Sequence, residues 1–107
     1  MHRALGPGLL ESAYEECLCL ELREAGILFD RQLSLPIVYK GIRLDCGFPL
    51  DVVIERGLIV EIKAVERLLP IHEAQMLTYL RLSRIQTGLL VNFNNLVLKD
   101  GLRRFVL

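Results

Sequence analysis

The chain of 107 residues has no apolar run long enough to cross a bilayer, few cysteines and no excess charge of either sign. A membrane-spanning helix needs about 20 consecutive apolar residues, so we expect no membrane contact. The first residues lack the pattern of a signal peptide. The chain also has no repeats, low-complexity segments or linkers. Its length predicts one domain, residues 1–107, with a single core.

The three cysteines, Cys17, Cys19 and Cys46, are an odd number without the spacing of a metal site. Cys17 and Cys19 cannot pair with each other within one helix. Reduced thiols are typical of cytosolic proteins, so we expect a cytoplasmic location.

The formal net charge is zero, which argues against strong sequence-independent binding to DNA. A local basic face is compatible with this balance, and so is an ordinary solvated surface. The candidates for such a face are Arg81, Arg84, Arg103 and Arg104. Apolar residues, in contrast, make up 52% of the chain, which predicts a well-filled core or a buried interface. Exposed strand edges also need covering, so we expect a homodimer.

The stretch from Asp51 to Lys63 predicts a β-hairpin. Apolar residues alternate through it with the period of a strand, at Leu50, Val52, Ile54, Leu58, Val60 and Ile62. A two-residue turn at Arg56-Gly57 would mix the apolar face of one strand with the charged face of the other.

A three-residue loop, Glu55-Arg56-Gly57, instead puts all six apolar residues on one side. In this register Val52 lies opposite Val60, and Asp51 lies opposite Glu61. We therefore predict the three-residue loop, with Gly57 in the left-handed region at its end.

The predicted register brings Asp51, Glu61 and Lys63 onto one patch of the sheet. Two carboxylates at cross-strand distance repel each other unless a cation lies between them. Oxygen ligands favour Mg²⁺ or Mn²⁺ over zinc, and a lysine beside the metal can orient or deprotonate a water molecule. The same three residues also fit a plain surface hairpin with a Glu–Lys pair.

An Asp followed after nine residues by Glu-x-Lys on a hairpin resembles the PD-(D/E)XK nuclease superfamily. The resemblance is closer to the small bacterial GxxExxY family, whose motif matches Gly8-Leu9-Leu10-Glu11-Ser12-Ala13-Tyr14. Also similar are the stretches LDVVIERGLIVEIKAVERLLPIHEAQMLTYLRL and GLLVNFN, so the similarity covers nearly the whole chain. One departure is Leu50, which stands where the superfamily name has proline.

The resemblance implies a restriction-endonuclease-like core of the α/β (α+β) class and a metal-dependent nuclease that acts on DNA. It implies that Asp51 and Glu61 bind Mg²⁺ or Mn²⁺, with the Ile62 carbonyl as a possible third protein ligand. Lys63 then orients the attacking water, and Glu11 binds a second metal or a metal water.

Two further roles follow from the resemblance. Gln75 matches the polar residue that borders the active site on the helix after the Glu-x-Lys strand. Tyr79, at i+4 from Gln75, and Tyr14 are candidates for substrate binding. A core tyrosine is an equally good interpretation of Tyr79, and His72 is predicted to cap its helix or to face solvent and not to bind a metal.

The first helix is predicted over residues 8–25, between Pro7 and Gly26. One face carries Glu11, Tyr14, Leu18, Leu22 and Ala25, and the other carries Ser12, Glu15, Glu16, Cys19 and Arg23. A carboxylate on the apolar stripe needs a partner, because burying an unpaired charge is costly. The alternative for Glu11 is an exposed position favoured by the helix dipole.

The remaining elements complete the order α-β-β-β-α-β, with a terminal strand or hairpin. A strand around Leu33 to Tyr39, with Pro36 at an edge or bulge, turns at Lys40-Gly41 into a strand from Ile42. A helix spans Pro70 to Leu82, and Thr87 to Phe93 is a buried strand. The predicted terminal hairpin pairs Leu96–Leu98 with Leu102–Val106. This order predicts a mixed sheet flanked by two helices.

A rival interpretation is a catalytically weak or inactive module that keeps this fold and acts in nucleic-acid binding or protein assembly. The small size, the neutral charge and the lack of an obvious DNA-clamping insertion favour it.

Overall fold

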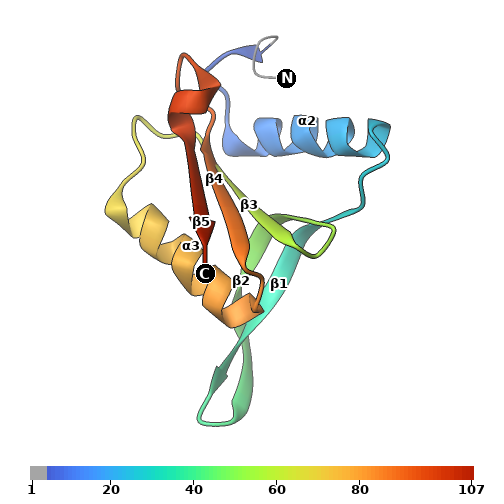
Figure 1. The fold of residues 1–107 in the computed structure, drawn as a ribbon, viewed down its shortest axis with the longest axis vertical. Helices are drawn as coiled ribbons and strands as arrows, with labels where there is room; N and C mark the ends of the chain where they lie inside the picture. Colours follow the sequence, from blue (N-terminus) through green and yellow to red (C-terminus); the bar gives the residue numbers. More distant parts are fainter. Residues whose placement is uncertain (1–4) are drawn as a thin grey trace.

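The computed structural model describes residues 5–107, apart from the side chains of Asp45, Cys46 and Phe48. The elements follow the predicted order (Figure 1). They are α2 (Glu11–Glu24), β1 (Phe29–Tyr39), β2 (Ile42–Ile54), β3 (Leu58–Lys63), α3 (Pro70–Ser83), β4 (Thr87–Asn92), the 3-10 helix η1 (Leu98–Gly101) and β5 (Leu102–Val106). The predicted class, a mixed sheet with two flanking helices, is confirmed. No helix in the described part of the chain is long and apolar enough to span a membrane.

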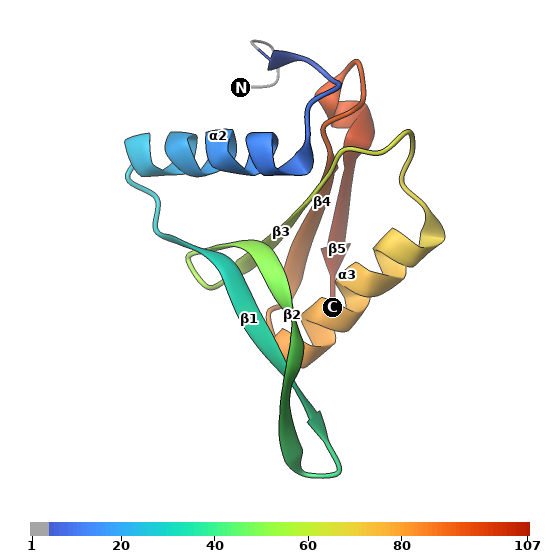
Figure 2. The ribbon, with the colours of Figure 1, turned by 180° about the vertical axis from the view of Figure 1, so that it is seen from behind.

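The five strands form one sheet in the order β1-β2-β3-β4-β5. Only β3 and β4 are parallel, and α3 connects them. The prediction that Pro36 lies at an edge or a bulge is confirmed. β1 is an edge strand of the sheet, and its register with β2 shifts between Leu35 and Ile37. The far end of the β1–β2 hairpin extends as an arm beyond the rest of the sheet (Figures 1 and 2).

The two helices cover opposite faces of the sheet. Val52 and Val60 pack with α2, whereas their sequence neighbours Val53 and Ile59 pack with α3, as expected when successive side chains point to opposite faces. Leu50 departs from this alternation: it joins the cluster around α3. The prediction that all six apolar hairpin residues lie on one side is therefore wrong for Leu50.

The hairpin register is confirmed, with Val52 opposite Val60 and Ile54 opposite Leu58. The predicted conformation of its loop is wrong. Glu55 and Arg56 have positive φ values of 49° and 55°, and Gly57 does not. Two successive left-handed residues make a tight turn whose twist matches the strands, closed by the Gly57 N–H donating to the Ile54 carbonyl at 3.0 Å. Gly57 therefore needs no left-handed conformation of its own.

The helix ends are close to those predicted. The chain leaves α2 through Gly26 at φ 71°, and the N–H of Ile27 donates to the carbonyl of Leu22, which is a Schellman ending. The start of α2 is Glu11 and not residue 8, so Pro7 lies outside the helix. At α3, His72 acts as a cap: its Nδ1 accepts a hydrogen bond from the Leu69 N–H at 3.0 Å.

The C-terminal hairpin differs from the prediction. Residues 96–98 form no strand with Leu102–Val106; instead, β5 pairs antiparallel with β4. The 3-10 helix η1 makes the connection. Pairing with β4 lets β5 cover what would otherwise be an open edge of a buried strand.

Candidate active site

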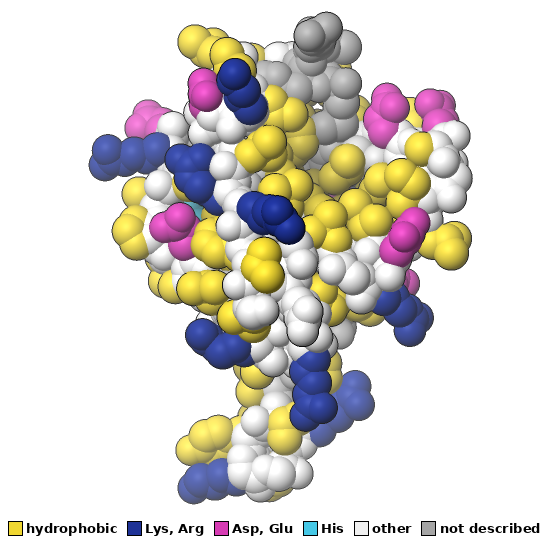
Figure 3. Space-filling view, in the orientation of Figure 1, with side chains coloured by type: hydrophobic (Ala, Val, Ile, Leu, Met, Phe, Trp, Pro, Cys, Tyr) yellow, Lys and Arg dark blue, Asp and Glu magenta, His cyan; other side chains and the backbone are white. Residues whose placement is uncertain are grey.

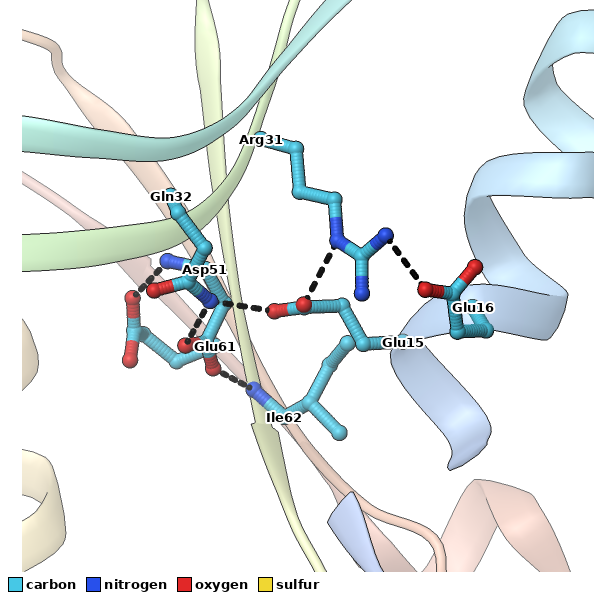
Figure 4. Close-up of polar contacts among 7 residues, drawn as sticks. All are labelled: Glu15, Glu16, Arg31, Gln32, Asp51, Glu61 and Ile62. Carbon is cyan, nitrogen blue, oxygen red and sulfur yellow. Dashed lines mark hydrogen bonds and ion pairs between the residues drawn. The ribbon is translucent and has the colours of Figure 1, made fainter. Parts of the chain in front are cut away.

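Asp51 and Glu61 face each other just beyond Val52–Val60, the last residue pair of the ladder between β2 and β3. Past this pair, carboxylate oxygens accept the hydrogen bonds of main-chain N–H groups (Figure 4). The N–H of Asp51 donates to Glu61 Oε1 at 3.1 Å, and the N–H of Ile62 donates to Asp51 Oδ2 at 2.8 Å. Each carboxylate is thus held by an amide of the neighbouring strand.

Burial acts on both carboxylates, and the charge of Asp51 acts on Glu61. Glu61 is only 6% exposed. Burial, and then the charge of Asp51, raise the pKa of Glu61 from 4.5 to about 8, against the opposing effects of the Asp51 N–H and the Lys63 charge. Burial also raises the pKa of Asp51, although the hydrogen bond from Ile62 opposes the shift. The pair therefore resists carrying two negative charges.

Lys63 and Tyr79 lie near this pair. Lys63 ends β3, two residues after Glu61, and is half-buried. Its positive charge lowers the pKa of both carboxylates without an ion pair within 4.0 Å among the described residues. Tyr79 reaches the site from α3: burial and the charges of Glu61 and Asp51 raise the pKa of its hydroxyl.

The helix carboxylate nearest the site is Glu15 and not Glu11. Glu11 is exposed in the first turn of α2, whereas Glu15 is 6% exposed. Glu15 Oε2 pairs with Arg31 Nε at 2.7 Å, and Glu15 Oε1 accepts from Gln32 Nε2 at 2.6 Å. The negative charge of Glu15 also raises the pKa of Asp51.

The error in the predicted helix face has a physical reason. The helical pattern predicts Glu15 and Cys19 on the outer face, but the structure buries both, together with Tyr14 and Leu22. The contact face of α2 is therefore rotated toward Glu15. The partners that make this burial tolerable are Arg31 and Gln32 on β1, more than ten residues away in the sequence. No local pattern in the helix could have identified them.

A second predicted site residue, Tyr14, contributes to the core and not to the carboxylate pair. Tyr14 is fully buried and its ring stacks on Phe93, with centroids 4.7 Å apart. Its hydroxyl donates to the Gly6 carbonyl and accepts from the Leu9 N–H, so Tyr14 is part of the core. Gln75 is exposed on α3, one helical turn before Tyr79.

The donors at the site suit a hard divalent cation. Among the described residues, no three side chains of His, Cys, Asp or Glu converge closely enough to enclose a metal ion. Asp51 and Glu61 nevertheless face each other with raised pKa values, and a cation between them would relieve their repulsion. Mg²⁺ commonly binds to one or two carboxylates and keeps several waters. The residues present therefore fit Mg²⁺ or Mn²⁺.

An apolar groove lies away from the carboxylates, between α2 and the strands, on the face seen in Figure 3. Its volume is about 380 Å³. It is lined by Leu18, Glu21, Ile54, Leu58, Val60, Leu89, Val91, Phe93, Leu98 and Leu102. Apart from Glu21 the lining residues are apolar and do not suit hydrolysis, so the groove is suited only to binding.

Comparison with known proteins adds one finding. The family model described as the PD-(D/E)XK nuclease superfamily matches residues 1–105. Searches of the curated proteins and of the solved structures gave no match. Asp51 on β2 and Glu61 and Lys63 on β3 belong to one hairpin within the matched residues. The chain therefore belongs to the PD-(D/E)XK nuclease superfamily.

Proposed function

We propose that this protein is a metal-dependent nuclease that hydrolyses phosphodiester bonds in DNA, and that it falls in the GxxExxY branch. The observation that carries the proposal is the repulsion between buried Glu61 and half-buried Asp51, with Lys63 beside them. The motif Gly8 to Tyr14 supports the finer family assignment.

The proposed roles follow from the positions of the groups. Asp51 and Glu61 hold Mg²⁺ or Mn²⁺, with the Ile62 carbonyl as a further ligand. The bound ion supplies Lewis-acid polarisation of the phosphoryl oxygens. Lys63 orients the attacking water, and its charge offsets that of the phosphate. The Tyr79 hydroxyl contacts the phosphate from α3, and Gln75 assists from the rim of the site.

A nuclease assay tests this proposal. Purified protein is incubated with single- and double-stranded DNA and with RNA, in Mg²⁺, in Mn²⁺ and in EDTA. We expect cleavage of DNA that requires the metal, and the same metals should raise the thermal unfolding midpoint, because a ligand that binds only the folded state stabilises it. Glu66→Gln, at an exposed acidic residue near Lys63, is a matched control that should cleave normally. Absence of cleavage of every substrate by the wild type would sink the enzyme proposal.

A second candidate function is a weakly active or inactive module for nucleic-acid binding or assembly. The neutral net charge and the apolar groove beside α2 favour it. A metal-induced rise in the unfolding midpoint separates the two candidates, since a module that has lost its metal site should show none.

We also propose a homodimer. The apolar groove beside α2 and the open edges of β1 and β5 are surfaces that a second copy would cover. Light scattering at micromolar protein should give twice the 12.2 kDa mass of the chain. A mass of one chain would end this proposal.

A further inference from the structure

Gln32 has an unusual backbone for its place in a strand. It lies on β1 between the pairs Arg31–Val52 and Leu33–Leu50, which puts it across from Asp51. Its φ is 52°, in the left-handed region, which residues with a Cβ rarely adopt in a strand. Such conformations persist only where the surroundings hold them, and they concentrate at functional sites.

The side chain of Gln32 shows what the conformation achieves. Its amide nitrogen donates to Glu15 Oε1 at 2.6 Å and to Asp51 Oδ1 at 3.4 Å (Figure 4). An ionised carboxylate only accepts hydrogen bonds, so an amide NH₂ with two donors suits a position between two of them. Gln32 thereby joins α2 to β2 through one group.

Glu15 is itself fixed, so this bridge has a firm support. Arg31 Nε binds Glu15 Oε2 at 2.7 Å, while Arg31 Nη1 binds Glu16 Oε1 at 2.8 Å. One guanidinium thus clamps two successive glutamates of α2. With Glu15 held on one oxygen by Arg31, the Gln32 amide on its other oxygen is oriented toward Asp51 (Figure 4).

Resting on the nuclease function proposed above, we infer that Gln32 is a positioning residue of the metal centre, which fixes the carboxylate of Asp51 by linking it to Glu15. Asp51 then has a donor on each side: Gln32 from β1 and the Ile62 N–H from β3. Hydrogen bonds to a ligating carboxylate orient it for the metal, and removing such a partner typically lowers metal affinity about 10- to 100-fold.

The test is titration calorimetry of the full chain with Mn²⁺, which does not depend on activity. Gln32→Met keeps the length and the strained backbone but has no donor. Gln32→Gly also removes the donor and relieves the backbone. We expect both variants to bind Mn²⁺ about 10- to 100-fold more weakly than wild type. Gln32 is exposed and Arg31 still holds Glu15, so both variants should fold. Both lose the hydrogen bond to buried Glu15, so both should unfold below the wild-type midpoint, and the glycine variant, whose backbone is relieved, should have the higher midpoint of the two.

Lys40→Gly is the matched backbone control. Lys40 also has a φ of 52°, but it lies at the tip of the β1–β2 arm. Its replacement relieves the same strain without touching a carboxylate, so Mn²⁺ affinity should equal that of wild type.

The other outcomes each overturn the inference in a recognisable way. Wild-type affinity in Gln32→Met would show that the amide positions nothing. Weak binding in Gln32→Gly alone would assign the effect to the backbone conformation. If the wild type binds no Mn²⁺, the metal centre of the proposed function fails, and this inference fails with it.

Discussion

Replacement of Asp51 by Asn is expected to abolish metal-dependent DNA cleavage while leaving the metal-free protein at least as stable as the wild type. The loss of activity follows from the loss of one of two carboxylates that hold the cation. A metal's contribution of several kcal/mol to the barrier corresponds to at least about a thousandfold in rate.

The expected stability has a different origin. Without a cation, the charge of Asp51 lies near that of Glu15 and helps to raise the pKa of Glu61 to about 8, so that Glu61 must keep a proton at neutral pH. Lys63 offsets only part of this charge. Asn removes the repulsion and keeps an oxygen that can accept from the Ile62 N–H. The costs are a weaker hydrogen bond from Ile62 and the loss of the 3.4 Å contact from the Gln32 amide, together about 1 kcal/mol. The stability gained from the relieved repulsion should therefore equal or exceed the stability lost with the hydrogen bonding.

The measurement is urea unfolding of both proteins in EDTA at neutral pH. Asp100→Asn, at an exposed acidic residue of η1, is the control and should change the unfolding free energy little. A clear loss of stability in Asp51→Asn, with an unchanged dependence on urea, would instead indicate a structural salt bridge and argue against a metal site.

The free energy of unfolding of the metal-free protein should fall as the pH rises from about 4.5 to 8. The folded protein holds a proton on Glu61 up to about pH 8, whereas an ordinary glutamate loses it near 4.5. Between these values the folded state binds more protons than the unfolded state, so raising the pH favours unfolding. The slope from one such group reaches about 1.4 kcal/mol per pH unit. Asp51, whose pKa is also raised, acts in the same direction.

Urea unfolding in EDTA across this pH range measures the effect, and Glu61→Gln provides the comparison. The difference between the two proteins isolates Glu61 from every other titrating group. In saturating Mg²⁺ the wild-type trend should weaken or reverse, because the metal competes with the proton for the carboxylates. Parallel pH profiles for wild type and mutant in EDTA would contradict the raised pKa of Glu61.

The sequence alone was enough to determine the hairpin that carries the acidic pair. Alternation of apolar residues from Val52 to Ile62 admits only one register that keeps them on a common side. Extended by one residue, that register places Asp51 beside Glu61, and the two are hydrogen-bonded in the structure. The argument works because a hairpin is local: the period of two and a three-residue loop leave little freedom. The bounds of α3 could also be predicted from the local sequence, since Pro70 suits the first turn of a helix.

Only the tertiary structure decided which helix carboxylate joins the site. Glu11 and Glu15 are one turn apart on α2, and either suits an amphipathic helix. The choice depends on how α2 is rotated against the sheet, which is set by Arg31 and Gln32 on β1. Such contacts join residues distant in the sequence, and a charge is buried only where they exist. The same holds for the left-handed Gln32, because its neighbours across the sheet, and no local turn signal, stabilise that conformation.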